Sequence, residues 1–267
     1  MLESILYPVI CVGALALVFG AILGLSAKKF AVETNPKVDR IINVLPGANC
    51  GGCGYAGCAV FAENVVKGEA NYRGCPPGGA SAAEEIAKFM GVDGTPVSRK
   101  AAFIKCNGSN DNIKRNYIYD GPKSCVSASQ LATGGNKTCR YSCIGLASCK
   151  NACPFGAIKI VDSIAVVIRE KCSACGKCVS VCPKNLIEII PDRNIVRVLC
   201  NSRDKAKFVR ESCRAGCFGC SVCQKVCKEG AITVEDNIAH INYEKCTLCM
   251  ECVNKCPAKA IKIMEQT

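Results

Sequence analysis

The amino-acid sequence predicts an α+β fold in successive parts: one N-terminal helix, a small helical domain and a duplicated cysteine-rich region. Three observations predict it. The chain begins with a long uncharged segment, residues 35–92 carry apolar residues at helical spacing, and residues 106–267 contain one cysteine pattern twice, among short strand pairs. We therefore expect domains at 1–29, 35–92, 100–191 and 192–267.

The first 29 residues predict a transmembrane helix. Ser4 to Ala27 include no charged side chain, and about 20 apolar residues span a bilayer. A cleavable signal peptide is the alternative, but the residues before the run lack a basic side chain and the run is too long for one. Lys28 and Lys29 follow directly. The positive-inside rule then predicts a single-pass protein of the cell membrane with its C-terminal domains in the cytoplasm.

The second part predicts three helices around a cysteine loop. Asn35 followed by proline is typical of a helix start, and the second helix is expected to end at Gly68. Ser81–Glu84 is a capping-box sequence, which predicts a third helix through Met90. The glycine-containing residues 91–99 then predict a linker.

Three segments of the cysteine-rich region predict strand pairs. Each has β-branched residues on both sides of a short turn, and we expect each to form a hairpin. They are residues 157–168, 186–199 and 231–242. His240 falls in the last of them, and we expect it at the surface rather than at a metal.

An internal repeat organises the cysteines. Eight of them recur 74 residues later, so one unit is present twice. The first copy contains Cys139, Cys143, Cys149, Cys153, Cys172, Cys175, Cys178 and Cys182, and the second contains Cys213, Cys217, Cys223, Cys227, Cys246, Cys249, Cys252 and Cys256. The repeat extends upstream to Cys106 and Cys200, and the first copy then carries about twenty extra residues, including Cys125.

The number and spacing of the cysteines predict metal ligation. The 267 residues include 25 cysteines, one His and no Trp, a composition of disulfide scaffolds or metal proteins. Tight C-x2-C runs favour metals. The run C-x2-C-x2-C-x3-C-P binds three corners of one [4Fe-4S] cube and gives its last cysteine to a second cube. Zinc sites instead combine two distant C-x2-C pairs, so zinc is the alternative.

Exchange of the fourth cysteine between neighbouring runs predicts two clusters in each copy. In the second copy the sets are Cys217, Cys220, Cys223 with Cys256, and Cys246, Cys249, Cys252 with Cys227. In the first copy one set is Cys172, Cys175, Cys178 with Cys153. Leu146 occupies the position equivalent to Cys220, so another thiol is needed there. We expect the remaining set to be Cys139, Cys143, Cys149 and Cys182.

The loop NCGGCGYAGCAVF, residues 49–61, supports two interpretations. Its glycines spell G-x-G-x-x-G, the sequence of a dinucleotide-binding turn, and its cysteines spell C-x2-C-x4-C. A dinucleotide turn follows a strand, whereas we expect a helix before this loop. We therefore predict a fifth [4Fe-4S] cluster, with zinc as the alternative, held by Cys50, Cys53, Cys58 and Cys75.

Four further cysteines have no place in these five clusters: Cys106, Cys125, Cys200 and Cys213. The simpler interpretation is unligated buried thiols. The alternative is one more metal site, because two of the four correspond through the repeat. Cys11 lies in the apolar helix, and we expect it to be inert.

The net charge of +12 by itself indicates nucleic acid or an anionic surface as a partner. Four thiolates give each cluster a charge of about −2, so five clusters lower the total to about +2. No nucleic-acid motif accompanies the basic residues, and we expect no nucleic-acid partner. The basic segment 202–211 is either a solvated helix or a docking face for an acidic redox partner.

The order of these features is that of a known family. An apolar helix, then PGANCGGCGYAGC and GCPPGG, then tandem two-cluster ferredoxin-like units together resemble the B subunits of Rnf complexes. The resemblance implies a membrane-anchored carrier that accepts electrons from reduced soluble ferredoxin. It would relay them to other Rnf-type subunits, membrane-bound and peripheral, in a complex coupling ferredoxin oxidation and NAD⁺ reduction to export of Na⁺ or H⁺.

Two other kinds of function stay open. One is the iron–sulfur subunit of a different membrane oxidoreductase, and the other is a membrane-tethered redox sensor. The sequence offers no acid–base pair and no nucleophile with a base partner, so we expect no catalytic residue in this chain. Enzymatic activity would belong to the complex.

Overall fold

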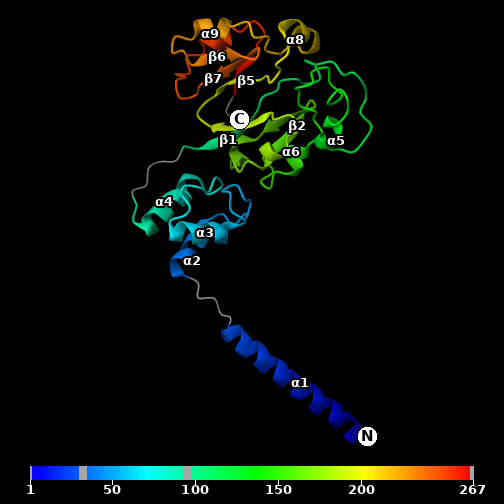
Figure 1. Ribbon diagram of the computed structural model, residues 1–267, viewed down its shortest axis with the longest axis vertical. Helices are drawn as coiled ribbons and strands as arrows, with labels where there is room; N and C mark the ends of the chain where they lie inside the picture. The colour runs from blue at the N-terminus through cyan, green and yellow to red at the C-terminus, as the bar shows by residue number, and fades with distance from the viewer. Residues whose placement is uncertain (1, 30–34, 93–97, 265–267) are drawn as a thin grey trace.

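The computed structural model describes residues 2–29, 35–92 and 98–264 (Figure 1). They combine α-helices with short β-strands, so the protein is mixed α and β, as predicted. Residues 93–97 of the expected linker lie outside the described residues.

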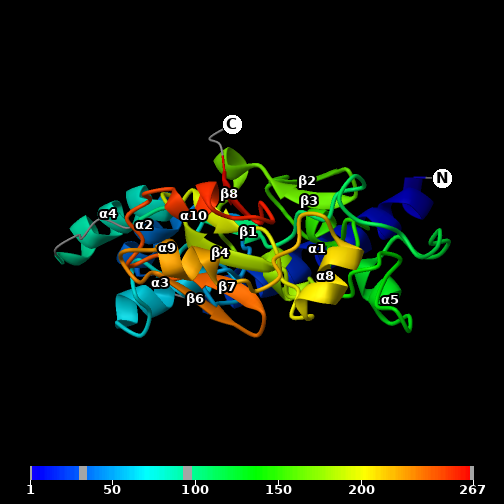
Figure 2. The ribbon, with the colours of Figure 1, turned by 90° about the horizontal axis from the view of Figure 1, so that it is seen from above.

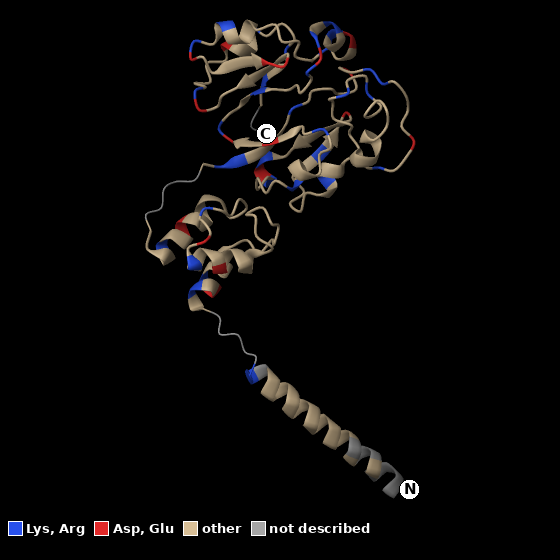
Figure 3. Ribbon diagram, in the orientation of Figure 1, with Lys and Arg blue, Asp and Glu red and all other residues tan. Residues whose placement is uncertain are grey.

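The N-terminal segment forms one helix, α1 (Leu2–Lys29). Figure 1 shows it extending away from the rest of the chain, and Figure 3 shows its basic residues at the end that leads to the next helix. Every described side chain from Val12 to Leu25 is exposed. Judged on the described residues, no helix has both the length and the apolar character that crossing a membrane requires.

The next three helices, α2 (Pro36–Val44), α3 (Cys58–Lys67) and α4 (Gly79–Met90), enclose a small apolar core. Asn35 caps α2 as predicted, because its Oδ1 accepts a hydrogen bond from the Lys37 N–H at 3.0 Å. Helix α3 ends at Gly68 in the left-handed conformation, also as predicted. The core between them contains Ile41, Phe61 and Ile86, each almost fully buried.

Helix α4 starts earlier than predicted. It begins at Gly79, after Gly78 as the capping residue, with no side-chain cap. Ser81 therefore lies inside the first turn, where its hydroxyl donates back to the Gly78 carbonyl at 3.3 Å. The capping-box prediction is wrong for this reason, although the helix itself ends at Met90 as expected.

Two of the three predicted hairpins are confirmed. Strand β2 (Ile158–Val161) pairs with β3 (Ile164–Val167), and β6 (Ile232–Glu235) pairs with β7 (Ile238–Ile241). Both hairpins turn through two residues with positive φ, at 162–163 and 236–237. Such turns match the twist of the flanking strands. His240 on β7 is exposed, as expected.

The third predicted hairpin is wrong in its pairing. Residues 186–199 do contain two strands, β4 (Ile187–Pro191) and β5 (Val196–Val198). However, β4 pairs with β1 (Lys100–Ile104), and β5 pairs with β8 (Ile261–Ile263). Each strand thus completes a sheet within its own copy of the repeat, and the turn between β4 and β5 joins the two copies. Local sequence marks a strand but does not choose a partner that is far away in the chain.

Short helices lie between the strands of the two copies, and five of them contain one cysteine each. The short helices are α5 (Cys125–Ser129), α6 (Ser148–Asn151), the 3₁₀ turn η1 (Arg169–Lys171), α7 (Lys177–Ser180), α8 (Ala206–Ser212), α9 (Val222–Val226) and α10 (Glu251–Asn254). Helices α6, α7, α9 and α10 share one construction. Each begins after a residue with positive φ and has a buried cysteine at its second position: Cys149, Cys178, Cys223 and Cys252.

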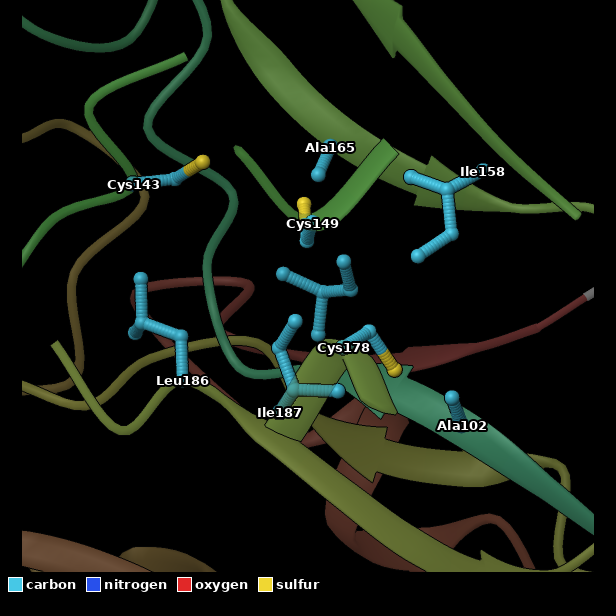
Figure 4. Packing of buried hydrophobic residues seen from close by; sticks show 9 residues of the cluster. Ala102, Cys143, Cys149, Ile158, Ala165, Cys178, Leu186 and Ile187 are labelled. Carbon is cyan, nitrogen blue, oxygen red and sulfur yellow. The ribbon is translucent and has the colours of Figure 1, made fainter. Parts of the chain in front are cut away.

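Each copy has its own apolar core with cysteines inside it. Figure 4 shows the first core, where Cys149 and Cys178 pack among the side chains of Ile158, Ala165 and Ile187. Figure 2 shows β1, β4 and β8 gathered at the middle of the molecule. There the Arg197 guanidinium of β5 lies over the Phe103 ring of β1, at 4.8 Å from its centroid.

Candidate iron–sulfur centres

The cysteines of the two copies converge on five hollows, and four cysteines line each one. Three of these sets are those expected from the spacing. We name them after one member: the Cys172 group (Cys153, Cys172, Cys175, Cys178), the Cys217 group (Cys217, Cys220, Cys223, Cys256) and the Cys246 group (Cys227, Cys246, Cys249, Cys252).

The fourth hollow differs from the partition that we expected in the first copy. It is the Cys143 group, lined by Cys125, Cys143, Cys149 and Cys182. Cys125, not Cys139, stands beside the others. The Cys125 N–H donates to the Ser148 hydroxyl at 2.8 Å, which fixes the start of α5 next to α6. The residues that the first copy has in excess therefore bring a thiol to the place where Leu146 offers none.

The fifth hollow lies between the two copies and contains the other cysteines that the spacing left over. It is the junction group, lined by Cys106, Cys139, Cys200 and Cys213. Each copy contributes two equivalent cysteines, so the group follows the symmetry of the repeat. We expected Cys139 in the Cys143 group, and the structure places it here instead.

A sixth set lies in the N-terminal helical part. Burial, followed by the nearby thiolates of Cys53, Cys58 and Cys50, raises the pKa of Cys75, so these four thiols lie close together. We call them the N-terminal group. The loop before α3 follows α2 and no strand, which removes the dinucleotide-turn interpretation. Asn49 closes the loop by accepting the Cys58 N–H at 2.8 Å.

The electrostatics of the groups favour bound cations. Burial raises the pKa of Cys200 and of Cys149 to about 12, and burial with adjacent thiolates raises that of Cys223 and of Cys252 to about 11. Four thiolates in one buried hollow are costly unless positive charge compensates them, and the iron of a cluster supplies that charge. The donor set of four cysteines fits [4Fe-4S] ligation.

Backbone donors already point at several sulfurs. The Gly108 and Cys143 N–H groups each donate to the Cys106 sulfur at 3.3 Å. The Ala102 N–H donates to the Cys172 sulfur at 3.3 Å. Such hydrogen bonds stabilise electron-rich sulfur and raise the reduction potential of a cluster.

Ligands of a single ion form a tighter arrangement than ligands of a cube. Over the residues that the structure describes, no three or more His, Cys, Asp or Glu side chains are placed as ligands of one metal ion. In a [4Fe-4S] cube each thiolate binds a different iron at a separate corner.

The six groups adjoin one another in a single order. A Cβ added at Gly52 would lie 2.9 Å from the Cys175 carbonyl oxygen, so the N-terminal group touches the Cys172 group. The Cys178 thiolate raises the pKa of Cys149 and thereby links the Cys172 and Cys143 groups.

The order continues through the junction group. The Cys143 N–H donates to Cys106, and the Cys217 backbone donates toward Cys200 in the same way. The junction group therefore touches one group of each copy. Cys223 and Cys252 share the second core, which joins the Cys217 and Cys246 groups.

Most of the cysteines fall within segments that match known iron–sulfur families, whereas Cys106, Cys125, Cys200 and Cys213 lie outside those segments. Residues 45–77 match a family described as a putative Fe-S cluster, residues 136–193 match the LdpA Fe-S cluster-binding domain, and residues 216–260 match a 4Fe-4S dicluster domain.

Similar proteins extend over nearly the whole chain. It is 44% identical to the B subunit of the Na⁺-translocating ferredoxin:NAD⁺ oxidoreductase complex of Acetobacterium woodii, across 98% of this chain and 78% of the relative. It is 40% identical to the B subunit of the ion-translocating oxidoreductase complex of Methanosarcina acetivorans, across 98% and 100%. The proton-translocating counterpart of Clostridium ljungdahlii is 39% identical, across 98% and 93%.

The chain belongs to this family of B subunits. The glycine–cysteine loop and its position indicated a resemblance to the B subunits of Rnf complexes. These relatives confirm that resemblance. Within the family, this chain is an iron–sulfur electron carrier of an oxidoreductase complex.

Proposed function

We propose that this chain is the electron-transfer component that accepts electrons from reduced soluble ferredoxin in an ion-translocating ferredoxin:NAD⁺ oxidoreductase complex. It relays them to the other membrane-bound and peripheral subunits, while the complex couples the reaction to Na⁺ or H⁺ export. The observation that carries the proposal is the row of six adjoining four-cysteine groups. A redox sensor has no need of a row.

The row contains six [4Fe-4S] sites in this proposal, one more than the spacing predicted. The ligand sets are the N-terminal group, the Cys172 group, the Cys143 group, the junction group, the Cys217 group and the Cys246 group. Together they use all 24 cysteines that follow α1. The domains remain those expected at 1–29, 35–92, 100–191 and 192–267.

The clusters supply reversible one-electron chemistry, and the residues of the chain determine where it takes place. In the two copies a buried cysteine shields each site from water, and backbone N–H donors at the sulfurs favour the reduced state. The direction of electron transfer in this proposal follows from the exposure of the cysteines at the two ends of the row. Cys220 and Cys249 are exposed in the second copy, whereas Gly52 lies against Cys175 in the first. We assign the exposed end to ferredoxin and the N-terminal group to the exit.

Helix α1 is assigned to the membrane. Its support is the uncharged run from Ser4 to Ala27 and the exposed apolar side chains along its described length, such as Leu17 at 77%. By the positive-inside rule, Lys28 and Lys29 at its end favour a single-pass protein with the cysteine domains in the cytoplasm. Deletion of residues 2–29 should release the chain from washed membranes into the soluble fraction. Retention by the membrane pellet would reject the anchor.

Metal analysis tests the cofactors. The anaerobically purified full chain should contain about 24 iron and 24 sulfide, four of each for every cluster. A value near 20 would restore the five-cluster prediction, and stoichiometric zinc would reject iron–sulfur ligation at the sites that bind it.

Reconstitution tests the function. The chain should co-purify with other subunits that together reduce NAD⁺ with reduced ferredoxin. A Cys75→Ala variant should leave the groups of both copies reducible by ferredoxin but stop transfer to the partners. Isolation as a lone dimer, or full transfer in this variant, would contradict the assigned role or the assigned exit respectively.

A further inference from the structure

Lys137 is a buried cation that forms no ion pair with a carboxylate of the described residues. Only 3% of the residue is exposed. Its Nζ donates to the carbonyl oxygens of Gly108 and Ser163, both at 2.8 Å. The ion pairs found among the described residues do not include it. An ammonium buried with two neutral acceptors is costly, so a compensating negative charge is expected nearby.

The nearest negative groups are the candidate cluster ligands. Burial, with a smaller contribution from the Arg115 guanidinium, lowers the pKa of Lys137, and the thiolates of Cys106, Cys143 and Cys213 act in the opposite direction. Two of these three belong to the junction group, and the third belongs to the Cys143 group beside it. Lys137 therefore lies between two candidate clusters, on the side of the junction group.

The other copy has no equivalent cation. The repeat places Glu211 at the position that corresponds to Lys137, and Glu211 is exposed on α8. The junction group is symmetric in its cysteines but has the buried positive charge on one side only. A structural requirement of the repeat would call for a lysine in both copies.

We propose that the buried ammonium of Lys137 raises the reduction potential of the cluster held by the junction group. A transferred electron is then stabilised on this cluster, at the boundary between the two copies. This inference rests on the proposed function, in which ferredoxin supplies the electrons. Each one-electron reduction adds one negative charge to the site. A fixed positive charge in a low-dielectric surrounding stabilises the more negative state. The charge of the ammonium group is the only property of Lys137 that this inference uses.

Charge-neutral variants of the full chain test the inference. Lys137→Met removes charge and donors, and Lys137→Gln removes the charge but keeps an amide that can donate. Lys137→Arg keeps the charge. Lys150→Met is the matched control, because Lys150 is exposed and adjacent to Cys149. Redox titration of the anaerobic chain, followed by electron paramagnetic resonance, measures each cluster. The signal lost in Cys213→Ala identifies the junction group.

Both neutral variants should lower the ratio of reduced to oxidised junction cluster at least tenfold at a fixed potential, about 59 mV for a one-electron couple. Lys137→Arg should retain most of the wild-type ratio of reduced to oxidised junction cluster. Lys150→Met should leave that ratio unchanged. Equal potentials in Lys137→Gln and wild type, with full iron, would overturn the inference. Loss of four irons in both neutral variants would also overturn it, because Lys137 would then be a structural residue.

The titration uses the isolated chain and no partner. A wild-type iron count far below 24, or no signal lost in Cys213→Ala, would point to failure of the proposed cluster sets rather than of Lys137.

Discussion

The two copies of the repeat have the same fold but complete one of their four-cysteine hollows by different routes. In the second copy, Cys217, Cys220 and Cys223 line one hollow from one short run of the chain that ends in α9. In the first copy, Leu146 stands where Cys220 would be, and Cys125 reaches the equivalent hollow from α5. Four thiols surround the hollow in both cases. The hollow, rather than the spacing along the chain, therefore identifies the set.

The surroundings of the copies differ as well. Gly52 of the N-terminal loop lies against Cys175 in the first copy, whereas the equivalent Cys249 of the second copy is exposed. Lys137 of the first copy adds a buried positive charge beside the junction group, where the second copy has the exposed Glu211. The two copies of the unit thus have different neighbours. The two ends of the row of groups therefore differ, although the sequence is duplicated.

Paired cysteine substitutions test the comparison with the largest effect. Cys125→Ala and Cys143→Ala should each remove one cluster and lower the iron content from about 24 to about 20. Because both residues belong to one group, the double variant should stay at about 20. Cys125→Ala combined with Cys139→Ala should instead remove two clusters and leave about 16, measured by iron and sulfide analysis.

The ligand sets expected from the sequence spacing predict a different outcome for substitutions of Cys125 and Cys139. These sets leave Cys125→Ala at full iron and keep Cys139→Ala with Cys143→Ala at the level of either single variant. That result would assign Cys139 to the same cluster as Cys143 and would reject the junction group as a ligand set.

Sequence reasoning grouped most of the cysteines as the structure places them, because local spacing determines which of them lie together. Tight runs such as Cys172-x2-Cys175-x2-Cys178 fix three corners within one loop, and the fold has little freedom to regroup them. Cys125 and Cys139 are different, because their neighbours are set by how α5 and the two copies pack. One signal was available: the cysteines after the N-terminal helix number 24, a multiple of four.

The strands show the same limit. The hairpins at 158–167 and 232–241 turn through two residues, so their pairing is local and was predictable. Strands β4 and β5 are also neighbours in sequence, yet each pairs with a strand at the far end of its own copy. Non-local pairing depends on the assembled cores, which a local pattern does not contain.

The contact between the copies should be the next most sensitive feature. Phe103 is 4% exposed and packs under the Arg197 guanidinium of the other copy. Phe103→Ala should destabilise the protein by about 3–5 kcal/mol, because it opens a cavity and leaves a buried cation without its ring. Anaerobic urea unfolding followed by circular dichroism measures the loss. Phe89→Ala is the control, since Phe89 is 43% exposed on α4. Equal midpoints for the two variants would show that the stack does not join the copies.

The contact of Gly52 with Cys175 of the first copy is expected to have a smaller effect on stability than the Phe103 contact. Gly52→Ala places a methyl group 2.9 Å from the Cys175 carbonyl oxygen, so the two loops must separate. Overpacking of this kind costs about 1–3 kcal/mol. Stopped-flow reduction by ferredoxin should show slower reduction of the N-terminal group, with the groups of both copies unaffected. Ala56→Val adds bulk at an exposed position of the same loop and should leave the rate unchanged. An unaltered rate in Gly52→Ala would remove this contact from the electron path.

The smallest expected difference concerns the two hairpin turns. In the first copy the Asn110 carboxamide accepts from the Ser163 hydroxyl at 2.9 Å and from Arg115 at 2.7 Å. In the second copy Arg203 forms an ion pair with Asp236 at 3.8 Å, and the two side chains are 64% and 70% exposed.

Substitution should therefore affect the two turns unequally. Asn110→Ala removes both hydrogen bonds to its side chain and should cost about 1 kcal/mol. Arg203→Ala removes one exposed ion pair and should cost less than about 0.5 kcal/mol, an effect that salt should screen out. Urea midpoints at low and high ionic strength separate the two cases. A larger, salt-dependent loss in Arg203→Ala would mean that the second copy holds its turn mainly by charge and the first by neutral hydrogen bonds.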